Sequence, residues 1–376
     1  MYLKLLPVLA LMMLVFSACQ KEIPTVKGPD LTEKQWIDAA EQQIRNARED
    51  GLRIQLQTMD RIPANAVELP AGSVDGLAAA IAEAGAGGTV LVKAGEHHET
   101  RTVVIDQKVS IIGEAGAEII SGVQPPGRVG YIQPALHLLN AEGVLVHGLS
   151  LRADSDYGGT GILIQNAPKA FISQNTFTNF GIGILNHHGD RSYITRNTIV
   201  GSSAWQTDLA SEVHGVVNMN GDRVRIFNNH ITNTIFGIWA CDEDGLLTGN
   251  TTNSNFIGLI LCKVPTALPL ADGTIVGSEN AGKNWITHHN TANGNYHVGI
   301  IVIDGANNNL LIMNKAADNV DADVELAGDT ERFGFLTPTS FDNKVISASG
   351  ISIKDCGINN SVNGGDLVDT SLNPCY

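Results

Sequence analysis

Aromatic and basic residues are scarce in this chain of 376 residues. Aromatic side chains make up 5% of the residues, and 24 Lys and Arg stand against 39 Asp and Glu, so the formal net charge at pH 7 is −15. This excess of acidic residues counts against nucleic acid and against an anionic membrane surface as partners. The low aromatic content counts against a groove lined with rings that stack on neutral sugars. The scarcity of basic and aromatic residues thus counts against nucleic acids, anionic membranes and neutral sugars as partners.

The N-terminal segment has no apolar run long enough to span a membrane. Its apolar residues extend from Leu5 to Phe16 after Lys4, which is too short and wrongly flanked for a membrane span and is typical of a signal peptide. Small residues precede Cys19, and Val15-Phe16-Ser17-Ala18-Cys19 resembles the bacterial lipobox. In that motif the Cys becomes the lipidated first residue of the mature protein.

The lipobox resemblance implies that residues 1–19 are a lipoprotein signal peptide and that Cys19 carries a lipid anchor. Gln20 stands where Asp would resemble an inner-membrane retention signal. The resemblance therefore favours the outer membrane, on its periplasmic side or at the cell surface, with contact to the membrane only through the lipid. The alternative is an ordinary signal peptide with a chance Cys at this position.

The middle of the chain repeats a frame. "GILNHHGDRSYITRNTI" from Gly183 aligns without a gap to "GVVNMNGDRVRIFNNHI" from Gly215, so that Gly189-Asp190-Arg191 matches Gly221-Asp222-Arg223. Similar segments begin at Gly161, Gly237, Gly258 and Gly299. A period of roughly 21–24 residues, built of short β-rich segments and polar turns, predicts a solenoid.

Each copy reads as strand, turn, strand, Asn, strand and turn. Apolar residues alternate in the first strand, as in Ile162 and Ile164, so one face is expected to be buried. A leucine-rich repeat would need a leucine frame and a helical return, whereas β-branched residues and Asn dominate here. We therefore predict an all-β, right-handed parallel β-helix whose stacked Asn side chains hydrogen-bond along the axis. The predicted ladder comprises Asn175, Asn197, Asn229, Asn250, Asn290 and Asn314.

This repeat resembles the pectate-lyase-like β-helix superfamily, especially its members with carbohydrate-binding and sugar-hydrolase repeats. The resemblance covers residues 66–355. Within it, Ser73 is the expected N-cap of a helix that presents Val74, Leu77 and Ile81 on one face and closes the open end of the coils. The expected flanking segments are residues 20–65, a tether with a helix over 31–50, and a C-terminal tail over 356–376.

Four cysteines remain once Cys19 is set apart, and in an exported protein they allow three disulfide pairings. Cys241 and Cys262 occupy the same position in consecutive copies, four residues after the frame glycine. Stacked strands lie about 4.8 Å apart, which suits a disulfide. Two free, packed thiols are an equal alternative. Cys356 and Cys375 remain to close the C-terminal tail.

Polar side chains follow the first strand of each copy. The resemblance to polysaccharide lyases implies a groove for an extended sugar chain beside this strand. Cleavage of a uronic acid chain by β-elimination needs a base, for which His187 and His188 are the candidates. It also needs neutralisation of the carboxylate, for which Arg191, Arg223 and Lys263 are the candidates.

Asp190, Asp222 and Asp242 are the candidate oxygen ligands for a cation such as calcium. A repeated Gly-Asp-Arg is also what a well-formed turn would contain. Two insertions, residues 200–214 and 263–285, are expected to wall the groove, and Tyr193 and Trp205 are candidates to stack on sugar. Loop packing is the alternative for both rings.

The segment "NHHGDRS" also resembles part of the alginate C5-epimerase motif, which Asp190, Arg191 and Ser192 match. The catalytic Asp-x-His of that motif does not match, because Asn186 cannot act as an ionised Asp. Further histidine pairs at His97 and His288 are candidates to bind metal, and periplasmic β-helix accessory proteins of copper enzymes are a related family. Adjacent residues on a strand point to opposite faces, however, so either pair alone is a poor chelate.

The sequence thus predicts a lipid-anchored β-helix lipoprotein of the outer membrane that binds or processes acidic polysaccharide. If it is an enzyme, a uronan lyase or an epimerase-like enzyme is expected. A non-catalytic surface adhesin, or an accessory protein that delivers metal, is the alternative.

Overall fold

The computed structural model describes residues 32–59, 62–123, 132–155, 159–206, 213–263, 268–269, 275–276, 278, 280–332, 335–371 and 375. The signal peptide and the predicted lipidation site at Cys19 lie outside these residues. The chain divides into two compact units, residues 1–46 and 47–376. Helix α2 (Glu33–Met59) begins two residues after the start of the helix predicted over 31–50 and continues beyond its end. Across the described segments, no helix combines the length and apolar character needed to cross a membrane.

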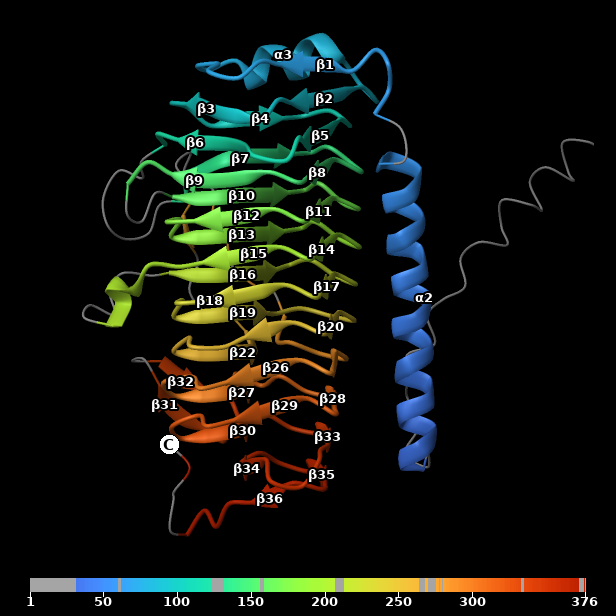
Figure 1. Cartoon of the computed structure of the whole chain (residues 1–376). Helices are drawn as coiled ribbons and strands as arrows, with labels where there is room; N and C mark the ends of the chain where they lie inside the picture. Colours follow the sequence, from blue (N-terminus) through green and yellow to red (C-terminus); the bar gives the residue numbers. More distant parts are fainter. Residues whose placement is uncertain are drawn as a thin grey trace, which may run out of the picture. The chain divides into compact units, whose positions relative to one another are not determined.

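Three parallel sheets make up most of the second unit, and each runs along the stack of coils (Figure 1). The twelve strands of sheet A are β1 (Val67–Leu69), β2 (Thr89–Val92), β5 (Ser110–Gly113), β8 (Leu145–His147), β11 (Phe171–Ser173), β14 (Tyr193–Thr195), β17 (Arg225–Phe227), β20 (Leu246–Thr248), β25 (Ile286–His288), β28 (Leu310–Ile312), β33 (Lys344–Ile346) and β35 (Ser361–Asn363). The nine strands of sheet B are β3 (Gly95–Glu99), β6 (Ala117–Ser121), β9 (Ser150–Ala153), β12 (Thr176–Thr178), β15 (Thr198–Val200), β18 (His230–Thr232), β21 (Thr251–Thr252), β26 (Thr291–Asn293) and β29 (Lys315–Ala317).

Sheet C has eleven strands and contains the first strand of each sequence repeat. These strands are β4 (Val103–Ile105), β7 (Pro134–Leu139), β10 (Thr160–Gln165), β13 (Ile182–His187), β16 (His214–Met219), β19 (Phe236–Ala240), β22 (Ile257–Leu261), β27 (Val298–Val302), β30 (Ala322–Leu326), β34 (Ser352–Asp355) and β36 (Asp366–Leu367). Two small antiparallel pairs, β23 (Leu268–Pro269) with β24 (Ile275–Val276) and β31 (Thr330–Arg332) with β32 (Phe335–Thr337), stand apart.

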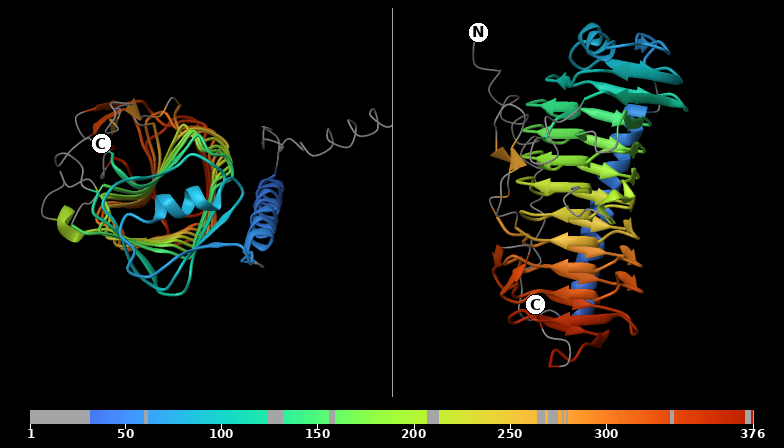
Figure 2. Two further views of the ribbon diagram at one scale, coloured as in Figure 1. Left: turned by 90° about the horizontal axis from the view of Figure 1, so that it is seen from above. Right: turned by 90° about the vertical axis from the view of Figure 1, so that its left-hand side faces the viewer.

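One coil passes through sheets C, A and B in turn, as β13, β14 and β15 do before β16 begins the next coil. Figure 2 shows the coils superimposed when they are viewed along their axis. The register follows the sequence alignment, since Ile184 pairs with Val216 and Asn186 with Asn218. The predicted right-handed parallel β-helix is confirmed.

The frame glycine is required by the close approach of neighbouring coils. A Cβ on Gly161 would lie 2.6 Å from the carbonyl oxygen of Gly183, and one on Gly183 would lie 2.8 Å from that of Gly215. Atoms cannot approach this closely, so any side chain here must displace the backbone. The repeat of glycine seen in the sequence is therefore a steric requirement of stacking.

The Asn ladder is present at the corner between sheets A and B. Each Asn Nδ2 donates to Oδ1 of the ladder Asn in the next coil, at 3.1 Å from Asn175 to Asn197 and 3.0 Å from Asn197 to Asn229. The ladder continues through Asn250 and Asn290 to Asn314. The preceding residue, for example Arg196 with φ 56°, adopts the left-handed conformation that makes this corner tight. The prediction of a structural Asn column is confirmed.

Two shorter ladders were not predicted. One joins Asn255, Asn295 and Asn319, and the other joins Asn309, Asn343 and Asn360. They serve the same purpose, because each Asn satisfies a backbone N–H at a corner where the strand hydrogen bonds stop. The long insertions between these asparagines hide their common position when the repeats are aligned in the sequence.

Helix α3 (Leu77–Ala84) lies across the first end of the coils, as predicted (Figure 2). Its start differs from the prediction, because Gly76 is the N-cap and Val74 is exposed. Ser73 Oγ instead bonds His97 Nδ1 at 2.9 Å. The carboxylate of the buried Glu99, from the next coil, accepts the N–H of Leu77 at 2.9 Å and supplies the missing cap.

The second end extends beyond the predicted boundary at residue 355, because β35 and β36 add strands to sheets A and C. A disulfide joins Cys356 to Cys375. The other predicted pair is not bonded: Cys241 and Cys262 are free, buried thiols with their Sγ atoms 3.2 Å apart. Stacking brings their sulfurs together, as predicted, but the covalent bond is absent.

Candidate functional site

The C–A turns, which link each sheet C strand to the following sheet A strand, carry the repeated Gly-Asp-Arg. Lys169, Arg191 and Arg223 occupy equal positions in successive turns, with φ between 57° and 59°. Their backbone N–H groups donate to carbonyls of the next coil, as Arg191 N does to Asp222 O at 2.8 Å. The left-handed backbone turns these long basic side chains outward, and Arg191 and Arg223 are exposed.

A cleft of about 390 Å³ runs along these turns. Its lining residues are Glu142, Pro168, Lys169, Asp190, Arg191, Asp222 and Arg223. Cations and carboxylates alternate along it: Lys169 pairs with Glu142 at 2.5 Å, and Arg223 lies 3.9 Å from Asp244. We call this set of lining residues the turn cleft.

The buried Arg225 makes hydrogen bonds to the backbone of two turns beside the turn cleft. Its Nη1 donates to the carbonyl oxygens of Arg223 at 2.6 Å and of Asp244 at 3.3 Å. Burial lowers the pKa of Arg225 to about 10, which leaves the guanidinium charged at neutral pH. Arg225 therefore holds two successive turns in place through their backbone.

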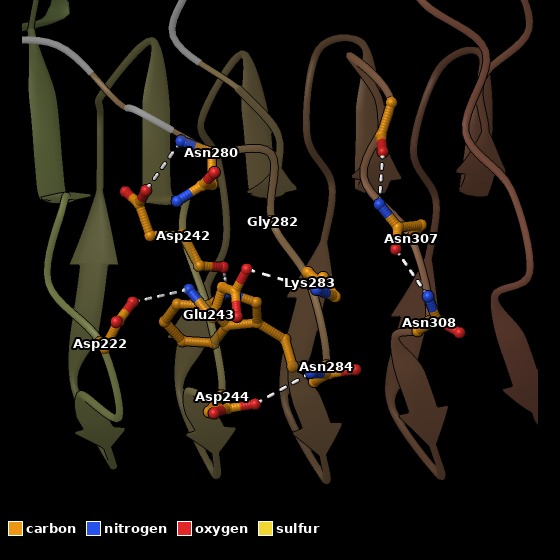
Figure 3. Close-up of polar contacts among 12 residues, drawn as sticks. Asp222, Asp242, Glu243, Asp244, Asn280, Gly282, Lys283, Asn284, Asn307 and Asn308 are labelled. Atoms are coloured by element: carbon orange, nitrogen blue, oxygen red, sulfur yellow. Dashed lines mark hydrogen bonds and ion pairs between the residues drawn. The ribbon is translucent and has the colours of Figure 1, made fainter. Parts of the chain in front are cut away.

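The three carboxylates predicted to bind calcium accept hydrogen bonds from backbone N–H groups. Figure 3 shows two of them, Asp222 and Asp242. Asp190 Oδ1 accepts from Asp222 N at 3.1 Å, and Asp222 Oδ1 accepts from Glu243 N at 3.1 Å. Asp242 accepts from the N–H groups of Asn220 and Asn280. Among the described residues, no three His, Cys, Asp or Glu side chains form a group that could hold a metal ion. These carboxylates therefore join neighbouring coils through hydrogen bonds to the backbone.

Desolvation raises the pKa of Asp222, and the nearby carboxylates of Asp190, Glu243 and Asp244 raise it further, against the lowering effect of its hydrogen bond from Glu243 N–H. A ligand group that donates a hydrogen bond to Asp222 would relieve this repulsion.

Glycine opens each Gly-Asp-Arg turn because asparagines project beneath it. Asn186 Nδ2 donates to Asn218 Oδ1 at 2.6 Å inside the coil, and Asn218 Nδ2 donates to Gly221 O at 2.9 Å. A Cβ on Gly189 would collide with the Asn186 amide. Packing inside the coil thus explains why a glycine begins the Gly-Asp-Arg turn.

His187 and His188 differ in exposure. His187 is 7% exposed and its Nδ1 has no hydrogen-bond partner, whereas the left-handed His188 is half-buried. Burial, followed by the neighbouring His188, lowers the pKa of His187 to about 4, so its imidazole is neutral at pH 7. Neither residue belongs to the lining of the turn cleft.

The remaining predicted residues are dispersed. Tyr193 lies on β14 in sheet A, where its ring packs against Phe171 with centroids 5.7 Å apart. Trp205 is 3% exposed and packs against Phe256 and Tyr296, so its ring faces are not open to sugar. Lys263 is exposed and follows β22. The ring exposed in this aromatic group is that of Tyr296.

His214 belongs to a further aromatic cluster on the outer face of sheet C. Its ring stacks on Phe236 with centroids 5.1 Å apart and meets the edge of Trp239. Complete burial lowers the pKa of His214 to about 4. The unfolded chain, with an ordinary His pKa, binds a proton below pH 6.5 that the folded protein excludes.

We therefore expect stability to fall as pH falls from about 6.5 to 4. In His214→Phe the fall should be smaller by about 1–3 kcal/mol at pH 4.5, since each pKa unit corresponds to about 1.4 kcal/mol. Urea unfolding at pH 7 and pH 4.5 measures this difference. Equal pH dependence in both proteins would contradict the neutral, buried state of His214.

Sulfur side chains form a buried column on the same outer face. Met219, Cys241 and Cys262 stand four residues after the frame glycine in consecutive coils, and His187 precedes them as the strand partner of Met219. All three sulfur residues are at most 1% exposed. Trp239 Nε1–H donates to Cys262 Sγ, and burial raises the pKa of the Cys262 thiol well above its usual range.

The structure thus brings Asp190, Arg191, Asp222 and Arg223 together and leaves the other predicted site residues outside the turn cleft. Sequence reasoning missed Glu142, Pro168 and Lys169. The alignment held the signal, because Pro168 and Lys169 stand at the Asp-Arg position of the copy that begins at Gly161. Their different residue types hid the shared column.

Comparison with known proteins agrees with this architecture. Residues 96–267 match the family model described as "Periplasmic copper-binding protein (NosD)". No curated protein matches the chain. The Dettilon tailspike protein is similar in structure, with a TM-score of 0.58, 14% identity, and coverage of 82% of this chain and 62% of that one.

Two further solved structures resemble the chain. A mutant tailspike of E. coli bacteriophage HK620, in complex with a pentasaccharide, has a TM-score of 0.50 and 12% identity, and 78% of this chain covers 56% of it. The periplasmic alginate epimerase AlgG has a TM-score of 0.43 and 13% identity, with coverage of 75% and 77%. The chain thus spans less than two thirds of each tailspike.

The description of the matched family names copper for that family. Thiolate, thioether and imidazole ligands favour Cu(I), and Cys241, Cys262, Met219 and His187 provide these groups. The turn cleft, which has only oxygen and cationic nitrogen groups, does not fit. At these low identities the solved structures bear on the fold alone, and they agree with the right-handed parallel β-helix that the three parallel sheets form.

Proposed function

We propose that this protein binds an acidic polysaccharide along the turn cleft. The observation that carries the proposal is the row formed by Lys169, Arg191 and Arg223 in one cleft, at the spacing of successive coils. An extended sugar chain presents carboxylates and hydroxyls at regular intervals. Guanidinium groups bind carboxylates through paired, charge-assisted hydrogen bonds, and Asp190 and Asp222 can accept hydrogen bonds from hydroxyls.

Binding is better supported than catalysis. The candidate bases His187 and His188 belong to sheet C and its strand end, and the cleft lining has no histidine. A β-elimination needs the base and the neutralising cation at one sugar unit. The tailspike in complex with a pentasaccharide supports carbohydrate as the partner class. A uronan lyase is the enzymatic alternative.

We also propose that the protein is exported and attached to the outer membrane by a lipid on Cys19. The lipobox-like segment at residues 15–19 supports this, and the periplasmic description of the matched family agrees with export. A lipid tether at one end would leave the turn cleft available to a polysaccharide outside the membrane.

The test replaces Arg191 and Arg223 together by Asn. Asn tolerates the left-handed backbone at both positions, so the turns should be kept while the charges are lost. Binding of polyuronate, measured by isothermal titration calorimetry, should weaken at least about tenfold, because a charged hydrogen bond contributes about 1.5–3 kcal/mol.

Arg196→Asn is the matched control, since Arg196 is exposed and left-handed but lies at the A–B corner. Its affinity for polyuronate should equal that of the wild type. Equal weakening in control and test variants would show non-specific attraction and reject the turn cleft. Unsaturated products, detected by ultraviolet absorbance during the same incubation, would instead support the lyase.

Copper handling is a second candidate function. It is favoured by the NosD match over residues 96–267 and by the sulfur column that this matched region contains. Glycan binding and copper handling use different residues, so each can be tested without the other.

A further inference from the structure

The three cations of the turn cleft differ in whether their charge is already neutralised. Lys169 Nζ lies 2.5 Å from Glu142 Oε1, and the hydrogen bond from Lys169 lowers the pKa of the Glu142 carboxyl. Arg223 Nε lies 3.9 Å from a carboxylate oxygen of Asp244. Arg191, in the turn between them, forms no ion pair with any carboxylate of the described residues. Of the cleft residues that the structure describes, Arg191 is therefore the cation whose charge is left for a ligand.

Carboxylates stand on both sides of Arg191. Asp190 precedes it in the same turn, and Asp222 lies in the next coil, about 4.8 Å further along the stack. Each uses one carboxylate oxygen to accept a backbone N–H, which comes from Asp222 for Asp190 and from Glu243 for Asp222. Both residues are exposed, and the second oxygen of each makes no hydrogen bond with the described residues. These oxygens are therefore open to a hydrogen-bond donor from a ligand.

The turn cleft has no excess of positive charge. Its lining contains three cations and three carboxylates, and two further carboxylates adjoin it, since Glu243 N donates to Asp222 and Asp244 lies beside Arg223. Desolvation and then the nearby carboxylates raise the pKa of Asp222, so its surroundings already disfavour negative charge. A ligand with a carboxylate on every unit would bring more negative charge within the roughly 10 Å over which charges interact at 0.1 M salt.

We propose that the turn cleft recognises a heteropolysaccharide whose acidic units are separated by neutral, hydroxyl-rich units. Arg191 binds the carboxylate of one acidic unit through paired hydrogen bonds, and Asp190 and Asp222 accept hydrogen bonds from hydroxyls of the neutral units beside it. A uronic acid homopolymer fits less well, because the units on either side of Arg191 bring carboxylates toward the two Asp side chains. This inference rests on the proposed binding of acidic polysaccharide and adds the spacing of charge along the glycan.

Galacturonate oligomers of equal length and different degrees of methyl esterification test this spacing. A methyl ester removes the charge of a unit and keeps the sugar backbone. In isothermal titration calorimetry, oligomers whose free carboxylates are separated by esterified units should bind at least about tenfold more tightly than fully acidic or fully esterified oligomers. Affinity that rises with every added free carboxylate would overturn the proposal.

Asp222→Asn tests the source of the discrimination. It removes the flanking charge and keeps an oxygen that can accept the N–H of Glu243. It should raise affinity for the fully acidic oligomer about twofold to fivefold, the range expected for exposed charge pairs, without raising affinity for the partly esterified one. Asp342→Asn is the matched control, since Asp342 is exposed on a later C–A turn outside the cleft lining. An equal gain in the control, or no gain in Asp222→Asn, would overturn the proposal.

Single Arg variants separate this inference from the proposed function. Arg191→Asn should weaken binding of the partly esterified oligomer at least about tenfold, because it removes the unpaired guanidinium. Arg223→Asn, at the same left-handed position of the next turn, should weaken it about threefold or less, because Asp244 already shares the charge of Arg223. Equal losses would reject Arg191 as the carboxylate receptor and leave the proposed function standing. No loss in either variant, or no binding by any oligomer, would reject both.

Discussion

Gly215→Ala is expected to prevent stable folding or to lower the free energy of unfolding by at least about 3 kcal/mol. The added Cβ would collide with the carbonyl oxygen of Gly237 in the next coil and would lie 2.5 Å from Ile231 Cγ2. Neither can move freely, because the carbonyl belongs to the neighbouring strand and Ile231 is fully buried. Urea unfolding followed by circular dichroism measures the loss.

Gly122→Ala is the matched control. A Cβ there would meet its nearest atom, Thr100 Cα, at 3.5 Å, which is an ordinary contact, and Gly122 does not need a left-handed backbone. The control should change stability by no more than about 0.5 kcal/mol. If Gly215→Ala were as stable as Gly122→Ala, the explanation of the frame glycine by coil spacing would be wrong.

Asn229→Leu should destabilise the protein by about 3 kcal/mol or more. Asn229 Oδ1 accepts from both the N–H and the side-chain amide of Asn197 at 3.0 Å. Its Nδ2 donates to Asn250 Oδ1 at 3.0 Å and to Ile194 O at 2.9 Å. Leucine leaves several of these buried groups without a partner, at about 1–3 kcal/mol for each.

Thermal and urea unfolding of Asn229→Leu should measure this loss of stability, with Thr176→Leu as the control. Thr176 lies on β12 with its side chain exposed, so the same apolar residue there should change stability by at most about 0.5 kcal/mol. Wild-type stability of Asn229→Leu would show that the ladder hydrogen bonds contribute little to the fold.

The repeat alone determined much of this architecture. Alignment of the segments at Gly183 and Gly215 placed equal residues in neighbouring coils, and this is possible because a solenoid makes contacts mainly between adjacent repeats. The Asn column from Asn175 to Asn314 and the turn at Gly189-Asp190-Arg191 followed from the same alignment. Stacking order is encoded locally, so it can be read without coordinates.

Only the tertiary structure shows which side chains on the outside of the coils are covered by other segments of the chain. The alignment does not say which outward side chains a neighbouring segment covers, so it could not show that Trp205 is buried while Tyr296 is exposed. Side-chain direction likewise decided that Cys241 and Cys262 are adjacent thiols.

The turn cleft shows the division between sequence and structure most clearly. Asp190 and Arg191 were recognised because the sequence repeats them, whereas Lys169 has the same place in its coil but a different neighbour, Pro168. The left-handed backbone, shared by Lys169 and Arg191, turns both cations into one cleft. Sequence determined the position of each residue within its coil. The path of the folded backbone decided which positions share a surface, because backbone direction at a turn depends on hydrogen bonds to the next coil.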